Sequence, residues 1–289
     1  MTAHASPSFP RIWLITGASR GIGARIAEAA LAQGDAVVAT SRSADSVTER
    51  LGASDALLPL ALDVTDEAQA RHAVGAALER FGRIDVLVNN AGYGLLGAVE
   101  EATADEVRRL YETNVFGLLN VTRAVLPCMR SRRAGHVINI SSLGGVQSAA
   151  GFGVYCSTKF AVEGITEALH AELAPLGIHA TVVVPGYFRT EFLDTASLSV
   201  SPLVLEDYAP SAGVVREAAR RINLNQPGDP VRLAQAMMQL VASPTPPLRL
   251  PLGTDTLQTI ADKHAFVEKE TAQWHALAAS TDFPVQAAA

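Results

Sequence analysis

A tyrosine and a lysine lie four residues apart in the segment Tyr155-Cys156-Ser157-Thr158-Lys159. On a helix this spacing places both side chains on one face, one turn apart. Tyrosine is a weak acid with an unperturbed pKa of about 10, and a cation one turn away stabilises its phenolate and lowers that pKa. Such a pair can donate a proton to an alkoxide and take it back. The alternative is a surface pair that only stabilises a helix.

Two serines, Ser141 and Ser142, stand at the end of the apolar run that precedes this pair. In an open parallel sheet, ligands bind outside the carboxyl ends of the strands. A serine hydroxyl at such an end can hydrogen-bond a carbonyl oxygen and hold it for hydride transfer. Tyr155, Lys159 and Ser142 therefore predict a site that transfers a hydride and a proton to or from a carbonyl group.

A glycine-rich segment at 16–23 follows the first apolar run and opens a helical one. Glycines permit a tight turn and a close approach of the backbone to pyrophosphate, and a helix N-terminus presents free N–H groups to phosphate. The segment predicts a dinucleotide-binding loop, and the alternative is an ordinary glycine-rich turn. The candidate contacts in this loop are Gly17, Ser19, Gly21, Ile22 and Gly23.

The end of the second apolar run bears on the choice of cofactor. Sites that prefer NAD usually carry an acidic residue there, which accepts from the ribose 2′-hydroxyl. This sequence has no acid at that end and has Arg42 instead, whose forked cation suits a 2′-phosphate. We therefore predict NADP(H) as the cofactor, and a solvated loop arginine is the alternative.

The elements that must position these residues follow from hydrophobic periodicity. Short apolar runs alternate with helical segments, which is typical of a parallel sheet covered by helices on both faces. The sequence predicts a doubly wound, Rossmann-type α/β fold. Strands are expected at 11–16, 36–41, 57–62, 84–89, 136–141, 178–184 and 248–252, and helices at 21–33, 66–81, 103–129, 154–173, 230–241 and 254–275.

No internal repeat or linker divides the chain, so we predict a single domain over 11–275. The irregular segment 190–225 is expected to form a substrate-binding lobe. We interpret 1–10 as a disordered tail and 276–289 as a C-terminal tail.

Composition narrows the function classes. A net charge of −6 gives no electrostatic attraction to nucleic acid or to an anionic membrane. No apolar run is long enough to cross a bilayer, and no secretory signal is recognised. The two cysteines and the scattered histidines lack metal-ligand spacing, so we expect a reducing, cytoplasmic location and no metal. Cys156 is interpreted as a small packing residue, with a reactive thiol as the alternative.

The spacing Thr-Gly-x-x-x-Gly-x-Gly at 16–23 and the Tyr-x-x-x-Lys pattern at 155–159 resemble motifs of the short-chain dehydrogenase/reductase family. The resemblance extends over about 11–190 and implies an oxidoreductase with a small-molecule carbonyl or alcohol substrate. It implies that Lys159 also binds the nicotinamide ribose, and it favours Ser142 over Ser141 through the spacing to Tyr155. It further implies that Asn114 lies in a distorted helix and supports a water in a proton relay.

Further segments match the cofactor-binding motifs of that family. Asp63 could instead be a helix N-cap, and Asn90-Ala91-Gly92 a plain turn. Phe188 stands where the family has a small β-branched residue. The contacts that the resemblance implies are Arg20 with the 2′-phosphate, Asp63 with its neighbour Val64 at the adenine, Asn90, Ala91 and Gly92 beside the adenine ribose, and Pro185, Gly186, Phe188 and Thr190 around the nicotinamide.

The neighbourhood expected to receive the substrate is apolar, which predicts a hydrophobic ketone or secondary alcohol. The same residues could simply pack a core, and Arg189 is either a contact for an anion or a solvated side chain. The candidate substrate contacts are Ser142, Tyr93, Leu143, Tyr187 and Phe192, and Leu95, Val146, Phe152 and Leu193 complete the apolar set.

The C-terminal end departs from the family pattern. Leu250-Pro251-Leu252-Gly253-Thr254-Asp255 stands where relatives that resemble 3-oxoacyl reductases have an Asp-Gly-Gly segment used in a tetramer contact. This departure disfavours the usual tetramer and leaves a homodimer as an alternative. It favours relatives that resemble hydroxysteroid or retinol dehydrogenases.

Two other functions remain as alternatives to a reductase. A non-catalytic NADP(H) sensor or scaffold can share the fold, because fold alone does not determine function. Such a protein is expected to lose the tyrosine or the lysine, and this chain keeps both. Epimerase or dehydratase relatives use the same pair but space their glycines differently.

Overall fold

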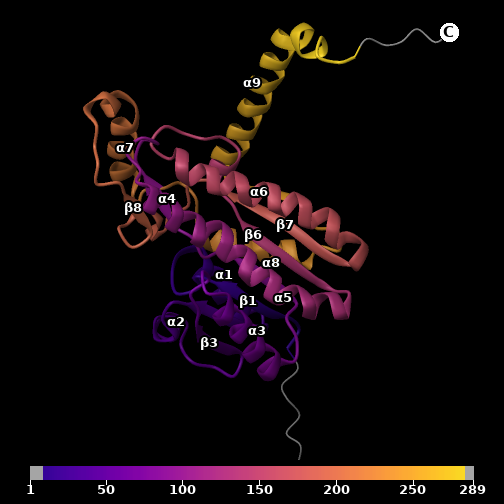
Figure 1. Ribbon diagram of the computed structural model, residues 1–289. Helices are drawn as coiled ribbons and strands as arrows, with labels where there is room; N and C mark the ends of the chain where they lie inside the picture. The colour runs from indigo at the N-terminus through magenta and orange to yellow at the C-terminus, as the bar shows by residue number, and fades with distance from the viewer. Residues whose placement is uncertain (1–8, 284–289) are drawn as a thin grey trace, which may run out of the picture.

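A computed structural model of the chain describes residues 9–283 (Figure 1). Residues 1–8 and 284–289, which belong to the predicted tails 1–10 and 276–289, lie outside the described residues. Within the described part, seven parallel strands form one sheet in the order β3-β2-β1-β4-β6-β7-β9. This arrangement confirms the predicted doubly wound parallel sheet. The strands of the sheet are β1 (Ile12–Thr16), β2 (Ala36–Ser41), β3 (Leu57–Ala61), β4 (Val86–Asn89), β6 (Gly135–Ile140), β7 (Ile178–Pro185) and β9 (Arg249–Leu252).

Helices cover both faces of this sheet, which explains why the strands are apolar throughout. In β1, Trp13 and Ile15 pack in one core with α1 and α8, whereas Leu14 packs in a second core with α3, α5 and α6. Successive strand residues point to opposite faces, so each face needs its own apolar set. The α-helices are α1 (Gly21–Ala32), α2 (Ala44–Leu51), α3 (Glu67–Phe81), α4 (Ala104–Tyr111), α5 (Leu118–Arg132), α6 (Gly153–Leu173), α7 (Val214–Ile222), α8 (Pro230–Ala242) and α9 (Thr254–Ala279).

Three local predictions differ from the structure. The expected helix at 103–129 is divided into α4 and α5 by a π-helical turn, Glu112–Gly117. The short helix α2 was not predicted, because it has only eight residues, few of them apolar, and only Val47 in it is buried. The last helix, α9, continues to Ala279, four residues beyond the predicted end at 275.

The predicted lobe contains more regular structure than its sequence indicates. Its strand β8 (Leu198–Val200) pairs in parallel with β5 (Gly94–Leu96), which follows β4 along the chain. Arg216 of α7 forms a buried ion pair with Glu101, which precedes α4. These contacts join the lobe to the segment after β4, and Figure 1 shows β8 and α7 at one end of the main sheet.

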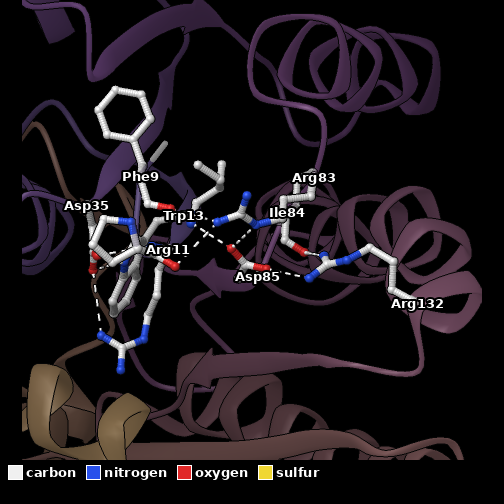
Figure 2. A network of polar contacts seen from close by, with 10 residues as sticks. Phe9, Arg11, Trp13, Asp35, Arg83, Ile84, Asp85 and Arg132 are labelled. Carbon is white, nitrogen blue, oxygen red and sulfur yellow. Dashed lines mark hydrogen bonds and ion pairs between the residues drawn. The ribbon is translucent and has the colours of Figure 1, made fainter. Parts of the chain in front are cut away.

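A network of charged residues joins elements around the start of β1 and β4 (Figure 2). The Asp85 carboxylate accepts hydrogen bonds from the Ile12 backbone N–H (2.9 Å), from Arg83 Nε (2.9 Å) and from an Arg132 guanidinium nitrogen (2.6 Å). The loop before β4, strand β1 and the end of α5 are therefore held by one side chain. Asp35 performs a similar task for β1 and β2, because it accepts from the indole Nε1 of Trp13 at 2.8 Å.

We expect Asp85→Ala to lower the free energy of unfolding by about 1.5–3 kcal/mol, since two arginines and a backbone N–H lose their acceptor while the arginines stay partly hydrated. Urea unfolding measures this loss. Asp55→Ala is the matched control, because Asp55 faces Arg80 across 3.6 Å with a side chain 94% exposed. The control should change stability by less than about 0.5 kcal/mol. Equal losses in the two variants would contradict a specific role for the network.

Candidate active site

A cavity of about 1210 Å³ opens at the carboxyl ends of the strands and extends from the glycine-rich loop to the lobe. It brings together nearly all the residues that the sequence singled out, although Gly23 and Asn114 lie outside its lining. The predicted residues that line it are Gly17, Ser19, Arg20, Gly21, Ile22, Arg42, Asp63, Val64, Asn90, Ala91, Gly92, Tyr93, Ser142, Leu143, Tyr155, Lys159, Pro185, Gly186, Tyr187, Phe188, Thr190 and Phe192.

The glycine-rich loop presents backbone groups that fit a phosphate. Gly17 and Gly21 have φ values of 65° and 57°, a region that residues with a side chain rarely adopt. Helix α1 begins at Gly21 without a side-chain cap and without an acidic residue in its first turn. The N–H groups of that turn are thus left for an anion at the positive end of the helix dipole.

Four hydrogen bonds made by the side chains of Thr16 and Asn90, together called the clamp, hold this loop against the end of β4. Thr16 Oγ1 accepts from the backbone N–H groups of Asn90 and Ala91, each at 3.0 Å. Asn90 Nδ2 donates to the carbonyl oxygens of Thr16 (2.9 Å) and Gly17 (3.0 Å). A Cβ on Gly23 would overlap both Asn90 Nδ2 and the Gly17 carbonyl. Gly23 therefore lies behind the loop and gives the clamp its space, which its sequence motif alone did not reveal.

The two candidate arginines occupy different surroundings. Arg42 lines the cavity together with Ser41, Ser43 and Ser46, which makes that corner polar and basic. Arg20 also lines the cavity, but its guanidinium donates to the carbonyl of Ala196 in the lobe. Arg42 thus lies in a polar corner of the cavity, whereas Arg20 links the glycine-rich loop to the lobe.

Asp63 lies at the end of β3 and is not a helix cap. Its Oδ1 accepts from the backbone N–H (3.0 Å) and the hydroxyl (2.8 Å) of Thr65. The N-cap of α3 is Asp66, which accepts from the N–H groups of Ala68 and Gln69. The capping alternative for Asp63 is therefore wrong, and this carboxylate remains at the cavity wall.

Tyr155 and Lys159 lie on one face of α6, with Lys159 Nζ 5.9 Å from the centre of the Tyr155 ring. Both side chains are buried, and Lys159 Nζ donates to the Ile140 carbonyl at 2.9 Å. Burial raises the pKa of the Tyr155 phenol well above its ordinary value, and the Ser142 hydroxyl opposes this rise. Burial lowers the pKa of Lys159 to about 8, which the Glu163 carboxylate counteracts.

The largest influence of the protein on the Tyr155 pKa is therefore burial, and not the predicted influence of Lys159. The sequence spacing suggested a lowered pKa for Tyr155, but removal from water disfavours the phenolate more strongly. At neutral pH the phenol keeps its proton in this environment. Ser142 stands beside it at the end of β6, where its Oγ accepts from the Gly144 N–H at 3.1 Å.

Asn114 lies in the π-helical turn between α4 and α5, and this agrees with the expected helix distortion. Its Nδ2 donates to the Tyr93 carbonyl (2.9 Å) and to Thr158 Oγ1 (3.1 Å), and its Oδ1 accepts from the Tyr93 N–H (3.1 Å). These contacts tie the segment after β4 to α6, one residue away from Lys159. The water relay that the family resemblance implies stays a prediction.

A residue that sequence reasoning missed supports the segment after β7. Asp255, in the first turn of α9, accepts from the Tyr187 backbone N–H at 2.7 Å, and a Cβ on Gly186 would overlap its carboxylate. The ring of Phe188 packs beside Gly228 and belongs to the core with α1 and α8. Arg189 Nε donates to the Gln226 carbonyl at 3.1 Å, so its side chain is tied within the lobe.

The part of the cavity wall around Tyr155 is aromatic. The Tyr155 ring centre lies 5.6 Å from that of Phe192 and 6.1 Å from that of Phe152. Leu193 also lines the cavity, whereas Leu95 and Val146 pack in neighbouring cores and do not. Cys156 borders the cavity, and burial raises the pKa of its thiol, which keeps it protonated and favours the packing interpretation.

Residues 9–283 contain neither a cluster of metal ligands nor a membrane-spanning helix. In that range, no three or more His, Cys, Asp or Glu side chains gather closely enough to hold a metal ion. The helices in the same range lack the combined length and apolar character that a membrane span needs.

With this geometry in place, comparison with known proteins identifies the family. Residues 11–199 match the family model described as short chain dehydrogenase. The chain belongs to this family. It is 38% identical to "Oxidoreductase BOA17" of Botryotinia fuckeliana, over 92% of this chain and 97% of that protein. It is 41% identical to "3-ketodihydrosphingosine reductase" of Bacteroides thetaiotaomicron, over 84% of this chain and 88% of that protein.

Solved structures agree with this family assignment. A short-chain dehydrogenase from Streptomyces avermitilis superimposes with a TM-score of 0.87 at 41% identity, over 94% of this chain and 100% of the other. A short-chain dehydrogenase/reductase from Burkholderia phymatum, 25% identical with a TM-score of 0.79 over 91% and 95% of the two chains, is in complex with NAD. ElxO, 28% identical with a TM-score of 0.70 over 86% and 99%, has NADP bound. The chain is thus an oxidoreductase whose structural relatives bind nicotinamide cofactors.

We expect Gly23→Ala to weaken the binding of both NADPH and NADH, because the new methyl group displaces the Asn90 amide and with it the loop. Overpacking of this kind costs about 1–3 kcal/mol, and the loss of affinity reaches about 5- to 150-fold when this cost falls on binding. Fluorescence titration measures the dissociation constants. Gly75→Ala in α3 is the control, because no atom lies within 4 Å of its new Cβ. Unchanged affinity in Gly23→Ala would show that the clamp does not shape the loop.

Proposed function

We propose that this chain transfers a hydride between NADP(H) and a hydrophobic ketone, aldehyde or secondary alcohol. The observation that carries the proposal is the single cavity in which Tyr155, Lys159 and Ser142 lie together with the glycine-rich loop. A dinucleotide with its phosphates at the start of α1 and its reactive ring near Tyr155 would span this cavity. The family assignment supports the reaction class, and the residue roles are our assignment.

NADP(H) is the proposed cofactor because of the corner beyond β2. The cavity there carries Arg42 and serine hydroxyls, and no acidic residue stands at the end of β2 to accept from a 2′-hydroxyl. An arginine offers two charge-assisted hydrogen bonds to a phosphate, and this interaction is absent for NAD(H). Asp63 and Val64 are assigned to the adenine, and Asn90, Ala91 and Gly92 to its ribose.

The proton steps follow from the buried tyrosine. When bound, the nicotinamide supplies the hydride for reduction and accepts it in the reverse direction. Tyr155 Oη donates its proton to the substrate oxygen during reduction, and the raised pKa of this phenol keeps the donor protonated at neutral pH. Ser142 Oγ hydrogen-bonds the same oxygen and holds it near Tyr155.

Lys159 has two tasks in this scheme. Its ammonium group stabilises the phenolate that remains after Tyr155 has given up its proton, and it binds the ribose next to the nicotinamide. The low dielectric of the buried site strengthens this charge interaction. Asn114 is a positioning residue, because it holds the Tyr93 segment against Thr158, the residue next to Lys159. We assign to it the support of the relay water.

The proposed substrate is apolar beyond its carbonyl group. Phe152, Phe192, Leu143 and Leu193 line the cavity beside Tyr155, and an apolar lining favours ligands that lose apolar surface to water on binding. A relative with 41% identity has a name that refers to the reduction of a ketone. We therefore propose a ketone with an extended apolar group as the preferred substrate.

Tyr155→Phe tests the catalytic assignment. We expect this variant to bind NADPH normally and to reduce ketones about 10²–10⁴-fold more slowly, because it lacks the proton donor. NADPH absorbance decay over a panel of apolar ketones measures the rates, and fluorescence titration measures binding. Tyr111→Phe serves as control, since its hydroxyl contacts Ser157 outside the cavity lining. Near wild-type turnover in Tyr155→Phe would remove Tyr155 as the donor, and wild-type binding without turnover in either direction would favour a sensor.

Arg42→Ala tests the cofactor preference. The variant should lose about 1.5–3 kcal/mol of NADPH binding through the missing charge-assisted hydrogen bonds and should bind NADH as the wild type does. Dissociation constants for both cofactors give the comparison. Arg71→Ala on the exposed face of α3, where Arg71 pairs with Glu67, is the control for a general loss of charge. Equal losses for NADPH and NADH in Arg42→Ala would refute the 2′-phosphate contact.

A further inference from the structure

The C-terminal helix α9 leaves the body of the protein and contacts it only near its first turns (Figure 1). Every residue from His264 to Ala279 is exposed. Several of these exposed side chains are large and apolar, and Trp274 is 59% exposed. Most helices in proteins gain their stability by packing an amphipathic face. The large apolar side chains on the outer part of α9 have no such partner among residues 9–283.

Four of the large apolar residues of α9, Leu257, Ile260, Val267 and Trp274, fall on a coiled-coil repeat, whereas Phe266 and Leu277 lie off it. Together with two polar residues, these four are spaced alternately by three and four residues, which places the set on one narrow stripe of the helix. The stripe carries two polar members, and such members define the register of coiled coils at a cost in stability. The residues of this stripe are Leu257, Ile260, His264, Val267, Thr271 and Trp274.

The charges beside the stripe indicate which partner fits it. Lys263 flanks one side of the stripe and Glu268 the other, five residues later. In a parallel pair of identical helices, these are the positions that meet across the interface, so Lys263 of one copy faces Glu268 of the other twice by symmetry. Glu270 and His275 repeat the same relation one heptad later. The flanking charges of α9 are therefore complementary to α9 itself.

A membrane surface fits this helix less well. Asp255, Asp262, Glu268 and Glu270 outnumber Lys263 and Lys269, so the helix is acidic when its histidines are neutral. Helices that lie on anionic lipid are usually rich in lysine and arginine on the polar face. The acidic balance and the self-complementary pairs both favour a protein partner with the same sequence.

We propose that α9 is a dimerisation helix that forms a parallel, two-stranded coiled coil with α9 of a second copy of this chain. The Val267 side chains of the two copies meet at the interface, and the Trp274 side chains meet one heptad later, beyond the Thr271 layer. The helix is anchored at its base by Asp255, which accepts from the Tyr187 N–H at the active-site cavity. The two catalytic bodies then lie at the same end of the helix pair.

Disulfide trapping tests the geometry. Val267→Cys should form an intermolecular disulfide under mild oxidation much faster than Lys269→Cys, which lies on the outer face of the proposed pair. Both positions are exposed, so neither variant disturbs a core, and the wild type gives the background from Cys128 and Cys156. Preferential trapping at position 267 is the expected result. Equal trapping at the two positions, or none at either, would overturn the proposal.

A charge reversal tests the partner. Lys263→Glu should weaken self-association about tenfold, since two attractive pairs become repulsive and each is worth a fraction of a kcal/mol to about 1 kcal/mol. The double variant Lys263→Glu/Glu268→Lys should restore it. Sedimentation velocity at several concentrations measures the association. An unchanged association constant in the single variant, or no rescue in the double variant, would refute the coiled coil, as would binding of the wild type to anionic vesicles without self-association.

These outcomes are independent of the proposed chemistry. NADPH titration and ketone reduction are measured on the same variants, and Lys263 and Glu268 do not line the cavity. A failed coiled coil with intact NADPH reduction leaves the enzyme assignment in place. Dimerisation without any turnover supports the coiled coil and contradicts the enzyme assignment.

Discussion

The joint between the ends of β1 and β4 is the contact on which the cavity depends. These neighbouring strands are the point at which the chain changes direction across the sheet, because β2 and β3 lie on one side and β4, β6, β7 and β9 on the other. Four hydrogen bonds between Thr16, Gly17, Asn90 and Ala91 close this joint. They fix the start of α1 and the turn after β4 together. The first-turn amides of α1 and the cavity wall beside them are therefore held in a fixed relation.

A second set of contacts brings the lobe at 190–225 to this joint. The lobe follows β7, about one hundred residues after the segment that it touches. The β5–β8 pair supplies backbone hydrogen bonds, and the buried Glu101–Arg216 pair adds a charge contact that would leave an unpaired buried charge if it opened. Arg20 joins the same lobe to the glycine-rich loop. The glycine-rich loop and the lobe are thus joined by contacts within the protein itself.

Burial is the largest influence on the pKa values of Tyr155 and Lys159. It raises the pKa of Tyr155 and lowers that of Lys159, so each group is shifted toward its neutral form. Glu163, one turn beyond Lys159, favours the charged lysine, and Arg249 in turn holds the Glu163 carboxylate at 2.8 Å. A line of alternating charges thus runs along α6 to β9. In such a dry site a ligand charge changes the proton affinities far more than it would in water.

The sequence by itself determined the sheet, the glycine-rich loop and the Tyr–Lys pair. Hydrophobic periodicity is local, and a spacing of four residues has the same meaning on any helix, so Tyr155 and Lys159 needed no tertiary information. Only the folded structure decided the direction of the Tyr155 pKa shift, the role of Gly23 behind the loop and the support of Tyr187 by Asp255. Each of these depends on burial or on contacts between residues far apart in the chain, and no local pattern records them. The stripe of α9 needs both kinds of information. Its repeat can be found in the sequence, but only the structure shows that the rest of the protein leaves its outer part uncovered.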